Sequence, residues 1–172
     1  MFQLKSLIII SLVFLSGRCI AQEYNFLHYG VQDGLPQSQA YDIYQDHHSY
    51  IWIATQGGGV GRFDGINFDA LTSRNGLPSN YVNTIYGDDE EDILFGTKAG
   101  LAIYRGDNIV HAIPTEVGIN HIIEKNDSVC WIATDRGLYE YNQRDLMLTK
   151  AKIDSRIDVP VSYTHLTLPT KA

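Results

Sequence analysis

The feature that most constrains the fold of this chain is a sequence pattern that recurs at a nearly constant spacing. The segment Asp33-Gly34-Leu35-Pro36 returns 42 residues later as Asn75-Gly76-Leu77-Pro78. Trp52-Ile53-Ala54-Thr55 returns at the same offset as Leu94-Phe95-Gly96-Thr97, and 37 residues further on as Trp131-Ile132-Ala133-Thr134. A period of this length is the signature of an array of similar structural units. We therefore expect three related units in a row.

Each unit is predicted to contain four short β-strands. In the first copy, runs of β-branched and aromatic residues alternate with polar or glycine-rich turns and cover residues 41–45, 50–55, 60–63 and 66–71. Asp64-Gly65 predicts a two-residue hairpin between the last two runs. A four-stranded antiparallel unit of about 42 residues has the size of one β-propeller blade. Helical repeats are disfavoured because glycine interrupts every stretch with helical spacing of apolar residues, and a parallel β-helix has shorter coils.

The predicted fold class is therefore all-β: a partial β-propeller of about three four-stranded antiparallel blades in an open, truncated ring. We place it at residues 22–158, with repeats at about 33–74, 75–117 and 118–158. Complete propellers close with about 4–8 blades, so three blades leave an apolar face at each end of the stack. The segment Tyr24 to Tyr29 is expected to be an outer strand that belongs to another blade.

The two ends of the chain are predicted to lie outside this fold. Residues 1–21 have the pattern of a cleaved secretory signal, with Lys5 before an apolar run and small residues at the cleavage site. The alternatives are an uncleaved anchor and a lipid-bearing Cys19. Cys130 would then be the one remaining cysteine, and we expect it to be a small buried apolar residue. Residues 159–172 are predicted to be a non-native tail, or alternatively a real edge strand. If the tail is non-native, we expect the natural protein to continue beyond this sequence.

Composition excludes some classes of function. A formal net charge of −7 disfavours nucleic acid as a partner, because phosphate binding requires clustered Lys and Arg. With 44% hydrophobic and 19% charged residues the chain is globular rather than disordered.

The repeats resemble a known family. The pattern D-G-L-P-x-S, followed by an I-x-x-D stretch, W-I-A-T-x-x-G-G and an F-D-G turn, is similar to the two-component regulator propeller repeats over roughly residues 24–150. The second copy departs from the pattern at Leu94, where Trp is usual, and the third lacks the G-L-P segment. The resemblance implies the periplasmic sensor region of a hybrid two-component system. It also implies a second propeller, an immunoglobulin-like module, a membrane helix, a histidine kinase and response-regulator parts beyond this chain.

The sequence shows no pattern that predicts catalysis, a cofactor or a metal site. The repeated glycines before Val60, Leu101 and Leu138 are predicted to be turn residues with positive φ rather than a phosphate-binding loop. His47 and His48 have no third ligand at a suitable spacing. The acidic run at residues 88–92 aligns with a polar turn and lacks the ligand spacing of a calcium loop.

One surface is predicted to carry ligand-contacting loops. In an antiparallel meander, alternate connections emerge at the same end of the sheet. The loops between blades and the glycine-rich loops should therefore share one face, with the acidic turn on the other. The residues expected on the shared face are Gln37, Ser38, Gln39, Gln56, Ser79, Asn80 and Lys98.

The predicted function is part of an extracytoplasmic sensor domain of a two-component signal transduction protein. The fragment is expected to have no enzymatic activity of its own. By resemblance, its ligand is glycan-derived, the full-length protein is a homodimeric histidine kinase in the cytoplasmic membrane, and anchoring depends on a helix downstream of this chain. The alternatives are an exported propeller enzyme, such as a polysaccharide lyase or glycosidase, and a non-catalytic interaction module.

Overall fold

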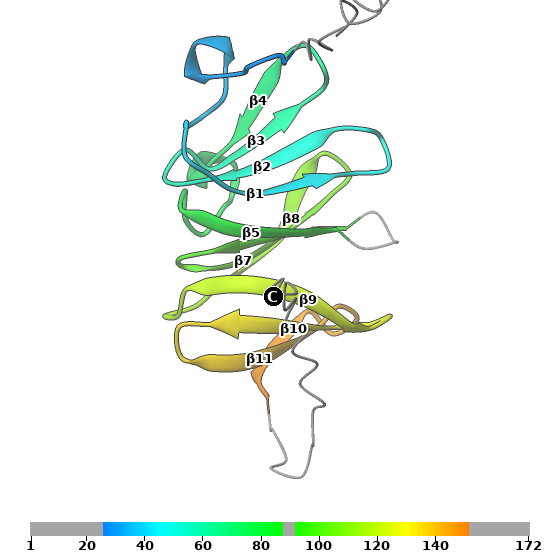
Figure 1. Ribbon diagram of the computed structural model, residues 1–172. Helices are drawn as coiled ribbons and strands as arrows, with labels where there is room; N and C mark the ends of the chain where they lie inside the picture. Colours follow the sequence, from blue (N-terminus) through cyan, green and yellow to red (C-terminus); the bar gives the residue numbers. More distant parts are fainter. Residues whose placement is uncertain (1–25, 88–91, 152–172) are drawn as a thin grey trace, which may run out of the picture.

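Three four-stranded antiparallel sheets make up the part of the chain that the structure describes (Figure 1). The computed structural model describes residues 26–87 and 92–151. The first blade contains β1 (Ala40–Gln45), β2 (Ile51–Thr55), β3 (Val60–Phe63) and β4 (Phe68–Leu71). The second contains β5 (Val82–Gly87), β6 (Ile93–Thr97), β7 (Gly100–Arg105) and β8 (Asn108–Pro114). The third contains β9 (Ile119–Asn126), β10 (Val129–Thr134), β11 (Gly137–Asn142) and β12 (Met147–Lys150).

The sheets are stacked face to face in a fan that does not close within the described residues (Figure 1). Each sheet runs through its four strands in chain order, so every strand pairs with its neighbours in sequence. Two single-turn 3₁₀ helices, η1 (Val31–Asp33) and η2 (Ser73–Asn75), precede the first and second blades. The predicted class, an all-β partial propeller of three open blades, is confirmed. The predicted signal at residues 1–21 and tail at 159–172 lie outside the described residues.

Two local predictions were wrong. Phe63 pairs with Phe68, so the last hairpin of the first blade has a four-residue loop and not a two-residue one. The Asp64 carboxylate accepts hydrogen bonds from the backbone N–H groups of Ile66 and Asn67, both at 2.7 Å, which stabilises the longer loop. The expected strand before the first repeat is also absent from its described part, residues 26–29. There, the Tyr29 ring packs on Phe63 of the first blade, with centroids 4.8 Å apart.

The apolar core forms two layers, one between each pair of adjacent blades. The first layer includes Trp52, Phe95 and Tyr104, with the Trp52 and Tyr104 ring centroids 4.8 Å apart. The second layer includes Leu94, Ile132 and Tyr141, among others. Because side chains alternate along a strand, Phe95 faces the first blade while its neighbour Leu94 faces the third. The burial of Cys130 in the second layer is as predicted.

Glycine is required where β2 turns into β3. Gly59 has φ +85°, and a Cβ atom there would lie 2.0 Å from the carbonyl oxygen of Leu71. The equivalent Gly100 has φ +137°, and its Cβ would lie 2.2 Å from the carbonyl oxygen of Ile113. The third copy, Gly137, has φ +112°. The prediction that these repeated glycines adopt positive φ is confirmed.

Hydrogen bonds also join the innermost strands of adjacent blades. The Asp42 carboxylate on β1 accepts from the Thr84 hydroxyl at 3.0 Å and from the Ile85 backbone N–H at 2.8 Å, both on β5. The Asn83 side-chain amide on β5 donates to the Ile119 carbonyl on β9 at 2.8 Å. Each innermost strand is therefore linked to the next by a polar side chain. Among the described helices, none has the length and apolar character needed to cross a membrane.

Candidate functional site

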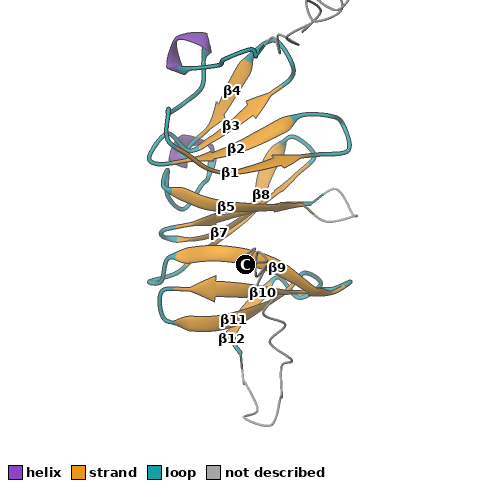
Figure 2. Cartoon of the chain, viewed as in Figure 1, coloured by secondary structure: helices purple, strands orange, loops and turns teal. Residues whose placement is uncertain are grey.

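The loops at one end of the strands, here called the glycine-loop face, are held together by backbone hydrogen bonds. Gln56 N–H donates to the Gln39 carbonyl at 3.0 Å, and the Gly57 and Gly59 N–H groups donate to the Asn80 carbonyl at 3.1 and 2.9 Å. Lys98 N–H donates to the Tyr81 carbonyl at 3.0 Å. These bonds join the loops between blades to the glycine-rich loops, as the strand count predicts. Figure 2 shows η2 at this end of the fan.

The seven residues predicted for this face lie in these loops. Gln37 and Ser38 bond to each other, because the Gln37 side-chain oxygen accepts from the Ser38 backbone N–H at 2.7 Å. The Asn80 side-chain oxygen accepts from the Ser73 N–H at 2.7 Å, and the Lys98 ammonium lies 4.7 Å from the centre of the Tyr81 ring. None of the seven lines either cavity described below. Ligand binding by this face stays a prediction.

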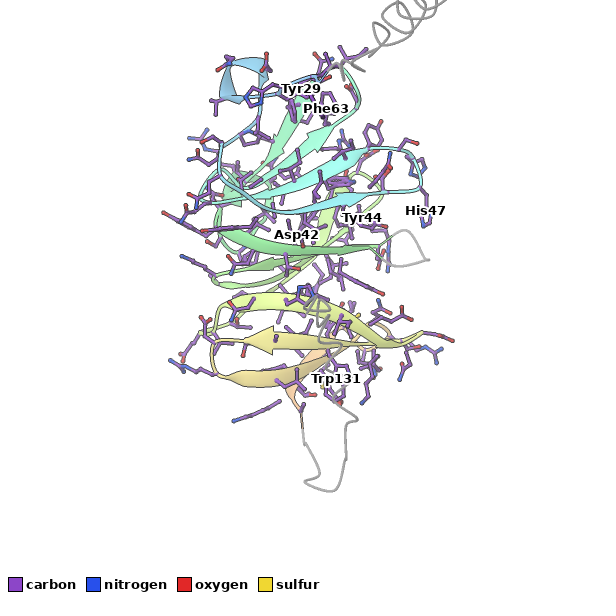
Figure 3. All side chains as sticks on the ribbon, viewed as in Figure 1. Tyr29, Asp42, Tyr44, His47, Phe63 and Trp131 are labelled. Atoms are coloured by element: carbon purple, nitrogen blue, oxygen red, sulfur yellow. The ribbon has the colours of Figure 1, made fainter. Side chains whose placement is uncertain are left out.

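The larger of these cavities opens at the opposite end of the strands, between the first and second blades. It has a volume of about 350 Å³. This end, here called the hairpin face, contains the β1–β2 turn, and Figure 3 shows His47 at the tip of that turn. Aromatic and charged side chains share the lining, which consists of Tyr44, Asp46, His47, His48, Tyr50, Trp52, Arg62, Asp92, Ile93, Tyr104, Gly106 and Asp107.

Asp46 organises the first-blade wall of the cavity. Its carboxylate accepts from the backbone N–H groups of His48 and Tyr50, both at 2.9 Å, and from the Trp52 indole N–H at 2.7 Å. These bonds shape the polar turn predicted at residues 46–49. His47 and His48 both lie in this turn and line the cavity. Within residues 26–87 and 92–151, no group of three metal-ligating side chains is suitably placed.

Arg62 connects the two walls. Its guanidinium donates to the Tyr104 hydroxyl at 3.0 Å and to the Asp107 carboxylate at 2.9 Å in the second blade. It also donates to Asp69 on its own blade at 3.2 Å. The guanidinium carbon lies 4.9 Å from the centre of the Tyr50 ring, a cation–π distance. Arg62 therefore links the two blades through hydrogen bonds and charge, while its stacking on Tyr50 holds it against its own blade.

This network shifts two pKa values. Partial burial alone would lower the pKa of Arg62, but hydrogen bonds to Asp69 and Asp107 and the Tyr104 hydroxyl outweigh it, so the pKa is raised. Burial raises the pKa of Tyr104 to about 12, opposed by the charge of Arg62 and supported by the hydrogen bond to Asp107. Arg62 stays cationic and Tyr104 stays a neutral hydroxyl at every physiological pH.

A second cavity, of about 290 Å³, lies between the second and third blades. Asp92 lines both cavities and is buried, and its carboxylate forms a bidentate ion pair with Arg105. Asp92 is the described end of the predicted acidic turn; residues 88–91 lie outside the described residues. The carboxylate of Asp92 thus has a structural partner on the neighbouring strand β7.

Sequence reasoning placed the ligand loops on the glycine-loop face and missed the cavity on the hairpin face. Its main residues, Arg62, Tyr104 and Asp107, come from different repeats and form no local motif. One available signal was Arg62 itself, because it lies directly across from Trp52 in the predicted meander. An arginine beside an inward-facing tryptophan indicates a charged group at a blade interface.

Comparisons with known proteins agree with this architecture. Residues 34–57 match the family model described as "Two component regulator propeller". This match confirms, at the first repeat, the resemblance stated from the sequence. No curated protein matches the chain significantly.

Two solved structures from B. thetaiotaomicron have the same fold over most of the chain. The extracellular domain of BT3049, described as a hybrid two component system, aligns with a TM-score of 0.64 and 22% identity over 74% of this chain. The extracellular domain of BT4673, also described as a hybrid two component system, aligns with a TM-score of 0.67 and 14% identity over 80% of this chain. The chain covers 19% of the length of each of these structures.

Proposed function

We propose that this chain, which carries a two component regulator propeller repeat, is part of an exported, non-catalytic sensor domain. In the full-length protein, ligand binding by this domain outside the cytoplasmic membrane would control a histidine kinase in the same polypeptide. The observation that carries the proposal is the combination of three stacked four-stranded blades with the family match at the first blade. The extracellular domains with the same fold are described as parts of two-component systems, which supports it.

We place the ligand in the cavity between the first and second blades. Its volume of about 350 Å³ is within the usual range for ligand sites. Its rings, from Tyr44 and Tyr50, suit the apolar faces of sugar rings, and the His47 imidazole and Asp107 carboxylate suit hydroxyl groups. A glycan-derived oligosaccharide is the ligand class that fits this combination of aromatic rings and hydrogen-bonding groups.

The hydrogen bonds and ion pairs of the cavity's carboxylates favour a binding site over a catalytic site. Asp46 accepts from Trp52, Asp92 pairs with Arg105, and Asp107 accepts from Arg62. A glycosidase, the second candidate, requires one carboxyl that donates a proton and one that attacks or activates water. The carboxylates of this cavity are instead used as acceptors for groups of the protein itself.

The test uses the full-length protein in membrane vesicles and a panel of oligosaccharides. We expect one oligosaccharide to bind by calorimetry without being cleaved, and to change autophosphorylation of the kinase. His47→Ala and Asp107→Asn should weaken binding, because both side chains are exposed and line the cavity. Gln37→Ala and Lys98→Ala, on the glycine-loop face, are the matched controls.

The outcomes separate the alternatives. Loss of binding only in the Gln37 and Lys98 variants would show that the ligand binds at the glycine-loop face instead of in the cavity. Cleavage of the oligosaccharide would favour the enzyme. A downstream reading frame without a kinase would refute the proposed function. Light scattering of the same preparation tests the proposed homodimer.

A further inference from the structure

The cavity between the second and third blades has a lining that differs from that of the first cavity. It also lies on the hairpin face, and Figure 1 shows the β9–β10 turn at the same end of the fan as the β1–β2 turn. Its charged lining residues are Asp92, Arg105, Asp127 and Arg144. No aromatic side chain is among the described residues that line it. The second cavity therefore provides charges and hydrogen-bonding groups, but no ring on which a sugar could stack.

Two of the four charges neutralise each other within the protein. The Asp92 carboxylate is buried and forms a bidentate ion pair with Arg105 on the neighbouring strand β7. Because the two charges are opposite and in contact, this pair adds no net charge to the cavity. The electrostatic character of the cavity therefore depends on Asp127 and Arg144.

Asp127 and Arg144 line the same cavity without pairing with each other. Asp127 lies in the turn between β9 and β10, Arg144 lies in the turn between β11 and β12, and both are exposed. Within residues 26–87 and 92–151, neither side chain takes part in an ion pair. The cavity therefore has a negative group and a positive group at separate places on its wall.

Backbone hydrogen bonds fix the two turns relative to each other. The Gln143 N–H donates to the Ser128 carbonyl at 2.9 Å, which joins the turns directly. The Asn142 side-chain oxygen accepts from the Arg144 N–H at 2.9 Å, which shapes the second turn. The backbone from which Asp127 and Arg144 extend is therefore ordered before a ligand arrives, and this order lowers the entropy cost of binding.

The two unlike charges determine which ligand chemistry fits the cavity. A guanidinium binds a carboxylate through two parallel hydrogen bonds, and an aspartate accepts hydrogen bonds from an ammonium group. An anion alone would be repelled by Asp127, and a cation alone would be repelled by Arg144. A neutral sugar would compensate neither charge. The volume of about 290 Å³, at the lower end of the range for ligand sites, suits one small molecule that carries both charges.

We propose that the cavity between the second and third blades binds a free α-amino acid, whose carboxylate pairs with Arg144 and whose ammonium group pairs with Asp127. This site goes beyond the proposed function, because it takes a different class of ligand in a different cavity. The linings of the two cavities have only Asp92 in common among the described residues. Failure of the oligosaccharide experiment therefore leaves this proposal intact.

The experiment measures binding of single radiolabelled L-amino acids to the full-length protein, purified in detergent, by equilibrium dialysis. We expect at least one amino acid to bind. Arg144→Gln and Asp127→Asn should each weaken its binding about tenfold or more, because each removes one charge-assisted contact. The matched controls are Arg136→Gln and Glu124→Gln, which remove the same charges from exposed residues of the third blade outside both cavities. They should leave the affinity unchanged.

Modified ligands then test which charge meets which side chain. The carboxamide of the same amino acid lacks the carboxylate, and its N-acetyl form lacks the ammonium charge, so both should bind the wild type about tenfold more weakly. In Arg144→Gln, the amino acid and its carboxamide should bind equally well. In Asp127→Asn, the amino acid and its N-acetyl form should bind equally well. A residue with only a structural role would not produce this pairing of variant and ligand.

Four results would overturn the proposal. They are the absence of binding by every amino acid, equal affinities in the two cavity variants and the wild type, binding of acetate or methylammonium as tightly as the amino acid, and oligosaccharide binding that is lost in Arg144→Gln. The last result would make this cavity an extension of the oligosaccharide site.

Discussion

Removing the Asp42 carboxylate should destabilise the interface between the first two blades. Asp42→Ala eliminates the acceptor for the Thr84 hydroxyl and the Ile85 backbone N–H. Thr84 is 1% exposed and Ile85 is 7% exposed, so water does not replace the lost acceptor. Leaving a buried backbone N–H unpaired costs about 1–3 kcal/mol, and the hydroxyl adds about 1 kcal/mol because it can rotate toward another acceptor. We expect a loss of about 2–4 kcal/mol in the free energy of unfolding.

The assay is urea unfolding of the 172-residue chain, followed by tryptophan fluorescence. Asp42→Asn keeps one acceptor oxygen and should lose about half as much stability as Asp42→Ala. Thr84→Val removes only the hydroxyl donor and should cost about 1 kcal/mol. Asp127→Ala, which removes an exposed carboxylate from a turn of the third blade, is the control and should stay within about 0.5 kcal/mol of wild type. If Asp42→Ala behaves like the control, the interblade hydrogen bonds are not a source of stability and the reasoning is refuted.

Three further predictions concern other parts of the fold. Gly59→Ala should reduce soluble expression severely, because its Cβ would lie 2.0 Å from a backbone oxygen; Gly65→Ala, also at positive φ but with nothing within 4 Å, should cost only about 1–2 kcal/mol. The contribution of Tyr104 to stability should be constant below pH 10, the ordinary pKa of tyrosine, and should fall as the pH rises towards about 12, because the folded-state pKa of Tyr104 is raised. Ultraviolet titration should show a tyrosine that ionises late, and the pKa of Tyr104 should be higher still in Arg62→Met. Cys130 should react with a thiol reagent only at the rate of unfolding, since it is fully buried, and fast reaction in the native state would contradict the second core layer.

The strands were predictable because their signals are local. The turn residues and the alternation along residues 51–55 and 60–63 mark strands without reference to the rest of the chain. Positive φ at Gly59 and Gly100 was also predictable, since the same residue recurs at the same place in successive repeats. The loop at Asp64 was not, because its length depends on two side-chain hydrogen bonds that compete with a tighter turn.

The candidate site was harder to predict because it lies between repeats. The sequence predicted that the loops containing Gln56 and Lys98 lie at the same end of the sheets, and they do lie there. The position of the cavity depends instead on which side chains meet across an interface. Arg62 reaches Tyr104 only because the two blades are stacked at a particular separation, a quantity that strand patterns do not contain.

The hydrogen bonds between blades also affect how the protein folds during synthesis. Asp42 and Thr84 are 42 residues apart, as are Arg62 and Tyr104, so each link closes over a single repeat length. Contacts of modest sequence separation form early, and chains fold from the N-terminus during synthesis. A nascent second blade therefore meets its complete docking surface as soon as it emerges, and the growing stack always exposes one unfinished edge, where chaperones would be expected to act.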